Sequence, residues 1–380
     1  MGTNERFGLY GSVFLASLGL GMYTYFVPIF AQLFGASFLD LGYIGTAYAV
    51  TYAVGPVLVG RLVDRVNRVR LYGFAIMINV GTTVALAFSK SVSEIIVVRA
   101  LAGVGLAFFW PITEALTLEL AHKEGRVREL GLFSVSFGTA FLIGPTLGGI
   151  EIQDLGFFDL FVISSALMIC ALVEAIALLS PEHRTNRART KHIDEPPHVM
   201  LRLLPWYLMI ACYGIVSSIV AAIFPGYANS IGMSAVSIGV LFTAFGIARV
   251  LVYSTAERYS HFGERRALVL AGLLIVLGSA IILLLPTFTG FLIAMMIVGA
   301  CFAVIYPLSI GLVSRHFSDA QTGFAVGSYE SVYGIGSMIG PVVAGTLASF
   351  AGARLSFLSV SFFAIVMVLF SAFAKTFSTD

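Results

Sequence analysis

Long apolar runs follow one another along almost the whole chain. Twelve segments each contain roughly 20 or more mostly apolar residues, the length that an α-helix needs to cross the hydrocarbon core of a bilayer. Hydrophobic residues make up 58% of the 380-residue chain and charged residues only 11%. A soluble domain of this length has too little interior to bury so much apolar surface. The sequence therefore predicts an all-α membrane protein, with spans at 8–32, 39–62, 71–89, 94–120, 129–150, 156–180, 204–230, 235–256, 267–286, 289–313, 324–350 and 355–375.

One long polar interval divides these spans into six and six. It predicts a first six-helix bundle at 1–180, a cytoplasmic central loop at 181–203 and a second six-helix bundle at 204–380. If both chain ends lie on one side of the membrane, 18 of the 22 Lys and Arg residues lie on that side too. Short cytoplasmic loops collect Lys and Arg. We therefore expect a multi-pass protein of the plasma membrane with both termini in the cytoplasm.

The two halves repeat each other at a nearly constant offset of 196 or 197 residues. The matching positions are Pro28 with Pro225, Trp110-Pro111 with Tyr306-Pro307, and Gly144-Pro145 with Gly340-Pro341. Chance coincidences of Gly and Pro would not keep one register across several spans. The sequence therefore predicts a duplicated six-helix bundle, and repeats of this kind place a binding site near the bilayer midplane.

A short charged stretch after the second span carries the most specific motif. Gly60, Asp64, Arg65 and Arg68 fit the pattern Gly-x-x-x-Asp-Arg-x-Gly-Arg, with Asn67 in place of the second glycine. Asn is the next most tolerant residue of a left-handed backbone, so the departure from the pattern is mild. Together with the twelve spans and the repeat, the motif resembles the major facilitator superfamily over essentially the whole chain. The resemblance implies two six-helix repeats and transport by alternating access.

The resemblance also implies roles for two motifs. The stretch that contains Gly60, Asp64, Arg65 and Arg68 would be a conformational latch, in which Asp64 accepts hydrogen bonds from a neighbouring helix end or an arginine. The alternative is that its arginines only mark the cytoplasmic side. A second motif in span 5 resembles that of the proton-coupled drug and metabolite antiporters, and consists of Gly144, Pro145, Gly148 and Gly149. Its alternative role is close helix packing, because the Gly-Pro pair recurs in span 11.

Five charged residues within the predicted spans need a reason, because charge at bilayer depth costs at least ~2.5–3.5 kcal/mol. They are Arg99, Glu114, Glu174, Arg249 and Glu330. Glu114, Glu330 and Arg99 are candidates for proton coupling: an acid could load and unload a proton, and Arg99 could pair with substrate or set the protonation of an acid. Structural anchoring is the alternative for each. The roles of Glu174 and Arg249 stay open.

Aromatic residues on the spans that line the central cavity of the resembled fold are candidates for substrate contact. A tyrosine facing lipid would bury its hydroxyl without a partner, so a tyrosine in the middle of a span favours a wet cavity. Packing between helices is the alternative. The candidates are Tyr23, Tyr25, Trp110, Tyr213, Tyr306 and Tyr333.

The sequence thus favours a secondary transporter over an enzyme. The preferred hypothesis is proton-coupled efflux of a small organic compound by alternating access. One alternative is a symporter or uniporter that imports a metabolite or an organic anion, and another is a non-transporting membrane receptor on the same fold. The sequence has no nucleotide-binding loop of the Gly-x-x-x-x-Gly-Lys-[Ser/Thr] type, which argues against ATP-driven transport.

No cofactor or metal is expected, because the three cysteines are scattered and the six histidines lie in predicted loops. The expected partners are a small-molecule substrate, protons and the lipid bilayer, with no nucleic acid. The fold that the sequence resembles usually works as a monomer, and we expect one here.

Overall fold

The structure, a computed structural model, describes residues 3–63, 66–120, 126–179, 197–253, 263–315 and 322–373. Every regular element within these ranges is a helix, as predicted. A helix satisfies its own backbone hydrogen bonds, which a bilayer interior requires because it contains no water. Eleven helical segments of the described chain are long and apolar enough to cross a membrane. Helix α3 (Phe38–Val63), with 26 residues, occupies the remaining predicted span.

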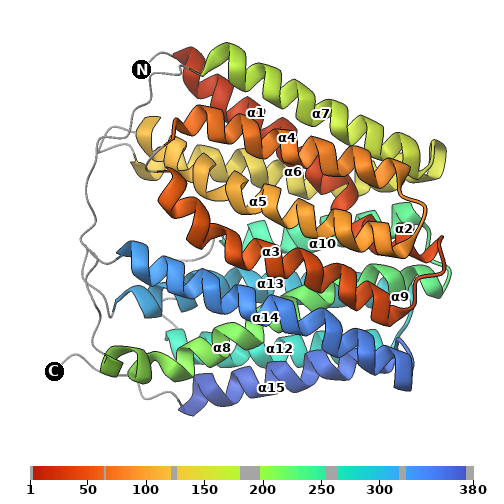
Figure 1. Cartoon of the computed structure of the whole chain (residues 1–380). Helices are drawn as coiled ribbons and strands as arrows, with labels where there is room; N and C mark the ends of the chain where they lie inside the picture. Colours follow the sequence, from red (N-terminus) through yellow and green to blue (C-terminus); the bar gives the residue numbers. More distant parts are fainter. Residues whose placement is uncertain are drawn as a thin grey trace. The chain divides into compact units, whose positions relative to one another are not determined.

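The helices follow the predicted spans closely (Figure 1). In the first repeat they are α1 (Thr3–Tyr23), α2 (Val27–Gln32), α3, α4 (Arg68–Phe88), α5 (Val92–Leu120), α6 (Arg126–Asp154) and α7 (Phe157–Leu178). In the second they are α8 (Pro197–Ala222), α9 (Phe224–Ser230), α10 (Ala235–Tyr253), α12 (Glu264–Leu284), α13 (Phe288–Ser314), α14 (Thr322–Ala351) and α15 (Leu358–Phe373). Spans 1 and 7 are each broken near the repeated proline into a long and a short helix.

Contacts between helices group the chain into two units. Unit 1 comprises Met1–Ala188 and Pro225–Thr243, and unit 2 comprises Arg189–Phe224 and Ala244–Asp380. The predicted division at 181–203 falls mostly on residues outside the described ranges. The domain boundaries therefore stay a prediction.

Equivalent helices pack in equivalent ways within the two units. In unit 1, α1 packs against α6 and α7, while α4 packs against α5 and α7. In unit 2, α8 packs against α14 and α15, while α12 packs against α13 and α15. Each helix of the second set corresponds to a helix of the first set in the repeat. The duplicated six-helix bundle predicted from the spacing of Gly and Pro is thus confirmed in three dimensions.

Glycines that let two helices approach closely also occur at equivalent positions in the two repeats. In unit 1, a Cβ atom added to Gly103 of α5 would collide with the carbonyl oxygen of Tyr48 on α3. In unit 2, a Cβ atom added to Gly299 of α13 would collide in the same way with the carbonyl oxygen of Phe245 on α10. Small residues let spanning helices approach until their backbones touch.

A segment of the second repeat belongs to unit 1. The side-chain amide of Asn229 on α9 donates to Gln32 Oε1 on α2 at 2.8 Å, and Gln32 Nε2 donates to the carbonyl oxygen of Gly226 at 3.0 Å. Further along, the hydroxyls of Thr146 on α6 and Thr243 on α10 lie 2.7 Å apart. These contacts hold α9 and the first half of α10 to α2 and α6.

Asn67, which replaces the second glycine of the motif, does not have a left-handed backbone. This residue has φ −59° and ψ 122°, and it stands directly before α4. Its side-chain oxygen accepts a hydrogen bond from the backbone N–H of Arg70 at 3.1 Å. Asn is among the preferred residues at a helix N-cap, because its side chain satisfies an N–H group that the helix leaves free. The asparagine at position 67 therefore serves as the N-cap of α4.

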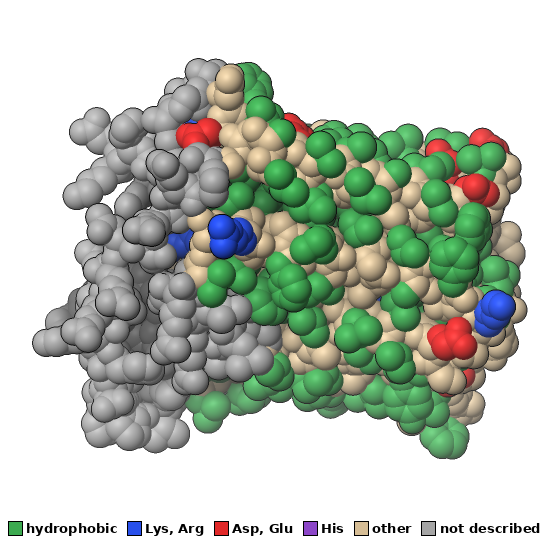
Figure 2. Space-filling model, turned by 45° about the horizontal axis from the view of Figure 1, so that its top comes forward, with side chains coloured by type: hydrophobic (Ala, Val, Ile, Leu, Met, Phe, Trp, Pro, Cys, Tyr) green, Lys and Arg blue, Asp and Glu red, His purple; other side chains and the backbone are tan. Residues whose placement is uncertain are grey.

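Much of the surface of the described residues suits contact with lipid. On the face drawn in Figure 2, hydrophobic side chains predominate, and the coloured acidic and basic side chains lie toward its ends. Large apolar side chains such as Phe7 and Ile176 are 70% and 69% exposed. Apolar exposure on this scale would favour aggregation in water but is stabilising against acyl chains.

Gly148 offers a test of the close packing between α1 and α6. An added Cβ would collide with the carbonyl oxygen of Met22 on α1, whereas one added to Gly138, on the same helix, meets nothing within 4 Å. We expect Gly148→Ala to lower the free energy of unfolding by about 1–3 kcal/mol, as overpacking does. Gly138→Ala should be neutral or stabilising by up to about 1 kcal/mol. Thermal unfolding in detergent, followed by circular dichroism, measures both, and equal midpoints would contradict the packing role of Gly148.

Candidate functional site

Arg99 of α5 is a buried cation inside a spanning helix of unit 1. Only 7% of its surface is exposed. Its guanidinium carbon lies 4.3 Å from the centroid of the Tyr48 ring, a cation–π contact. Its Nε atom is buried without a hydrogen-bond partner, and no acid in the described part of the chain pairs with it. The guanidinium thus has an aromatic face beside it but no anion.

Trp110 lies three turns further along α5, among three phenylalanines of α6. Its ring centroid is 5.3 Å from that of Phe137 in an edge-on arrangement, and Phe133 and Phe141 lie 6.4 and 6.2 Å away. The indole is only half-buried. It therefore serves helix packing and still presents part of its ring at the surface of unit 1.

Glu114 follows Trp110 by one turn, so the two side chains share a face of α5. It is exposed, and no hydrogen bond or ion pair to it is found within the described ranges. Along one helix, unit 1 thus carries an unpaired guanidinium, an indole and an unpaired carboxylate. This arrangement could hold a charged organic molecule, or accept and release a proton.

The two tyrosines predicted near the end of span 1 lie in different surroundings. Tyr23 is 1% exposed, and its ring packs edge-on against Phe161 of α7 with centroids 5.9 Å apart. Tyr25 stacks on Phe242 of α10, with centroids 3.8 Å apart. In this conformation Tyr23 is part of the core of unit 1, and Tyr25 is part of its contact with α10.

In unit 2 the structure brings Tyr306 and Glu330 together. The Tyr306 hydroxyl on α13 donates to Glu330 Oε1 on α14 at 3.4 Å. The Tyr306 ring also meets Tyr329 edge-on, with centroids 5.5 Å apart. Trp110 and Tyr306 are equivalent in the repeat, but among the described residues only Tyr306 has a hydrogen bond to an acid. The phenol of Tyr306 can donate a hydrogen bond to the Glu330 carboxylate, and this bond can also break.

Tyr213 and Tyr333, also predicted for the cavity, face each other in unit 2. Their ring centroids are 5.4 Å apart, and the Tyr333 hydroxyl lies 3.0 Å from that of Ser217. Tyr213 belongs to α8 and Tyr333 to α14, the helix of Glu330. Three predicted tyrosines and one predicted acid of unit 2 therefore come from three helices that pack together.

The remaining predicted positions carry less structural information. Gly60 lies within α3 and Arg68 begins α4, while Asp64 and Arg65 lie outside the described residues, so the latch stays a prediction. Glu174 is half-buried, and its carboxylate occupies the space that a Cβ on Gly11 would need. Within the ranges that the structure describes, no group of His, Cys, Asp and Glu side chains is arranged to hold a metal ion.

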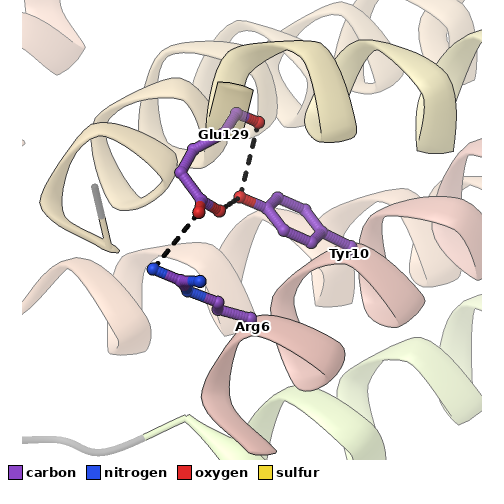
Figure 3. A network of polar contacts seen from close by, with 3 residues as sticks. All are labelled: Arg6, Tyr10 and Glu129. Atoms are coloured by element: carbon purple, nitrogen blue, oxygen red, sulfur yellow. Dashed lines mark hydrogen bonds and ion pairs between the residues drawn. The ribbon is translucent and has the colours of Figure 1, made fainter. Parts of the chain in front are cut away.

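One polar cluster was not predicted from the sequence. Glu129 of α6 is 2% exposed, and Figure 3 shows Arg6 and Tyr10 of α1 on either side of its carboxylate. Tyr10 donates to Glu129 Oε2 at 2.5 Å, and Arg6 Nη2 lies 3.2 Å from Oε1. In the sequence Glu129 is an ordinary acid at the start of a span, and only the α1–α6 packing reveals its partners. The cluster ties the beginnings of these two helices together.

Replacing Glu129 tests how far this cluster stabilises the protein. Glu129→Gln removes the charge that Arg6 and Tyr10 share, and hydrogen bonds to charged groups contribute about 1.5–3 kcal/mol. We expect the free energy of unfolding to fall by about that amount. Tyr10→Phe removes one hydrogen bond and leaves the ion pair, so its effect should be smaller. Thermal unfolding in detergent compares the two, and a Glu129→Gln protein as stable as the wild type would contradict the role.

Two repeated bundles of spanning helices, with charged and aromatic side chains inside the spans, define a multi-pass membrane transporter of duplicated design. The family model of the Major Facilitator Superfamily matches residues 9–206 and 206–378. The chain therefore belongs to the Major Facilitator Superfamily. It is a secondary active transporter that works by alternating access, not an enzyme.

Similar proteins agree with this assignment. Multidrug resistance protein 1 of Bacillus subtilis (strain 168) is 23% identical over 351 residues, covering 88% of this chain and 87% of the relative. Quinolone resistance protein NorA of Staphylococcus aureus is 21% identical over 359 residues, covering 91% and 90%. The crystal structure of the nucleoside transporter NupG has a TM-score of 0.85 at 14% identity, over 99% of this chain and 100% of that one. The structural likeness shows the fold.

Proposed function

We propose that this transporter exports a small organic compound in exchange for protons. Relatives that share about nine-tenths of their length with this chain are named for resistance to drugs, which favours export. The proposed proton coupling rests on the surroundings of the Glu114 carboxylate. It lies in a spanning helix, it is exposed, and the described residues offer it no cation.

An unpaired carboxylate in a spanning helix is suited to carry a proton. Charge at bilayer depth is costly, and protonation removes that cost whenever the group is closed off from water. Glu114 would take up a proton while its surroundings open to the outside and release it when they open to the cytoplasm. The substrate would move in the opposite direction. Glu330, with Tyr306 as its hydrogen-bond donor, is the second candidate for the same task.

The surroundings and the remaining motifs fit this proposal. The distribution of Lys and Arg favours both termini in the cytoplasm. The protein would lie in the plasma membrane and, as is usual for this fold, act as a monomer. Gly60, Asp64, Arg65 and Arg68 would form the latch that stabilises one of the two states. The alternative is that the protein imports a metabolite, with or without a co-transported proton. The direction of transport distinguishes this alternative from export.

Proteoliposomes that contain a pH-sensitive dye test the proposal. Organic cations, sugars and organic acids are added one at a time to the wild type, to Glu114→Gln and to Glu94→Gln. Glu94 is the control, because it lies on the same helix but at its beginning, where its carboxylate accepts a hydrogen bond from the backbone N–H of Lys90 at 2.7 Å. We expect at least one compound to drive proton movement in the wild type and in Glu94→Gln, with a loss of tenfold or more in Glu114→Gln.

The sign of the pH change separates exchange from co-transport. Proton movement opposite to the compound supports export by exchange, and movement in the same direction supports a symporter. If compounds cross without any pH change, the protein is a uniporter or uses another ion. If Glu114→Gln keeps the full signal, Glu114 is not the proton carrier, and Glu330→Gln is the next variant to examine.

A further inference from the structure

We propose that the buried guanidinium of Arg99 recognises a carboxylate group on the transported compound. The proposal rests on the transport function given above, and it adds a chemical class of substrate: small aromatic acids, or larger compounds that carry a carboxylate beside an aromatic ring.

The first argument is the missing counter-charge. Arg99 is 93% buried in a spanning helix, yet its described surroundings provide one aromatic face and no acid. Two more exposed arginines of the described chain do have an acid beside them. Arg6 is paired with Glu129 at 3.2 Å, and Arg315 with Glu264 at 2.5 Å. A buried cation without an anion is costly, so an arginine at this place suggests to us that an anion binds there during the cycle.

No acid on the same helix can supply this charge. Glu114 and Glu119 lie 15 or more residues further along α5, which places them about 22 Å or more away at the helical rise of about 1.5 Å per residue. Glu94 is nearer, but its carboxylate accepts the hydrogen bond from Lys90 at the beginning of the helix. The anion must therefore come from outside the described part of unit 1.

The second observation about Arg99 is that its guanidinium carbon lies over the Tyr48 ring, and all five N–H groups of a guanidinium lie in its plane. The Arg99 Nε atom has no hydrogen-bond partner among the described residues, and two parallel N–H groups of a guanidinium match the two oxygens of a carboxylate. A second ring, that of Tyr52, lies parallel to Tyr48 with centroids 6.1 Å apart, and extends the aromatic surface. The chemistry fits a carboxylate attached to an aromatic group.

The third argument is that this arrangement is held in place. One turn after Arg99, Gly103 brings α5 against the backbone of α3 at Tyr48. The hydroxyl of Thr51 on α3 also donates to the carbonyl oxygen of Ala100 at 2.6 Å. These contacts fix Tyr48 relative to Arg99, and a preformed site loses less entropy when a ligand binds. With 7% of Arg99 exposed, a ligand reaches it when the surrounding helices open, as alternating access requires.

The test compares an acid with a neutral ligand of the same shape. Benzoate and benzamide are titrated separately into purified wild-type protein, and dissociation constants are obtained from the rise in the thermal unfolding midpoint. The same titrations are made with Arg99→Gln, Arg99→Lys and Arg354→Gln. Arg354 is the matched control, because its side chain is exposed and donates to a backbone carbonyl, that of Leu283.

We expect the wild type and Arg354→Gln to bind benzoate at least tenfold more tightly than benzamide. Arg99→Gln should bind the two ligands equally, and Arg99→Lys should keep part of the preference. A general loss of stability would shift the unfolding midpoint without changing this ratio, so the ratio separates recognition from packing.

Three results would overturn the proposal. The wild type could show no preference for benzoate, Arg99→Gln could keep the full preference, or chloride could compete with benzoate and show that any small anion suffices. If Arg99→Gln does not fold, Arg99→Lys and the two ligands on the wild type still decide the matter. The binding measurement uses no proton gradient, so Glu114→Gln should keep the preference for benzoate over benzamide. If the proposed proton exchange proves wrong, this binding result is unaffected.

Discussion

Contact between helix backbones is the interaction on which the rest of this structure depends. Apolar helices gain no hydrophobic free energy by meeting each other in lipid, so close packing must hold them together. Gly144 and Gly148 of α6 leave no room for a side chain against Gly21 and Met22 of α1. At the other end of this helix pair, Glu129 binds Arg6 and Tyr10. Two separate contacts thus fix α1 against α6, the helix that also supplies the phenylalanines around Trp110.

The two repeats share this packing but carry different polar side chains. Trp110 in unit 1 is surrounded by phenylalanines, while its counterpart Tyr306 in unit 2 donates to Glu330. Arg99 brings a cation to unit 1, where it lies over the Tyr48 ring and no acid of the described residues pairs with it. Duplication has therefore preserved the positions where helices meet, whereas the side chains available for substrate and proton have diverged. This division explains how one fold serves many different substrates.

Much of the fold could be predicted from the sequence, because span length, Gly and Pro spacing and the position of Lys and Arg are local properties. The candidate site was harder to predict. Residue type did not show that Tyr23 packs in the core against Phe161. Glu129 was missed because its partners lie about 120 residues earlier in the chain, on a helix whose neighbour only the packing defines. Burial and pairing are properties of the folded chain and leave no local signal.

Gln32 and Asn229 stand at the same position in the two repeats, 197 residues apart, and they bond to each other. A position that meets its own counterpart must be chemically complementary to itself. A primary amide satisfies this condition, since it carries both a donor and an acceptor, whereas a carboxylate or an ammonium group would face its own charge. The same rule governs residues on the axis of a symmetric dimer. Joining two copies in one chain has kept that rule while allowing the two amides to differ in length.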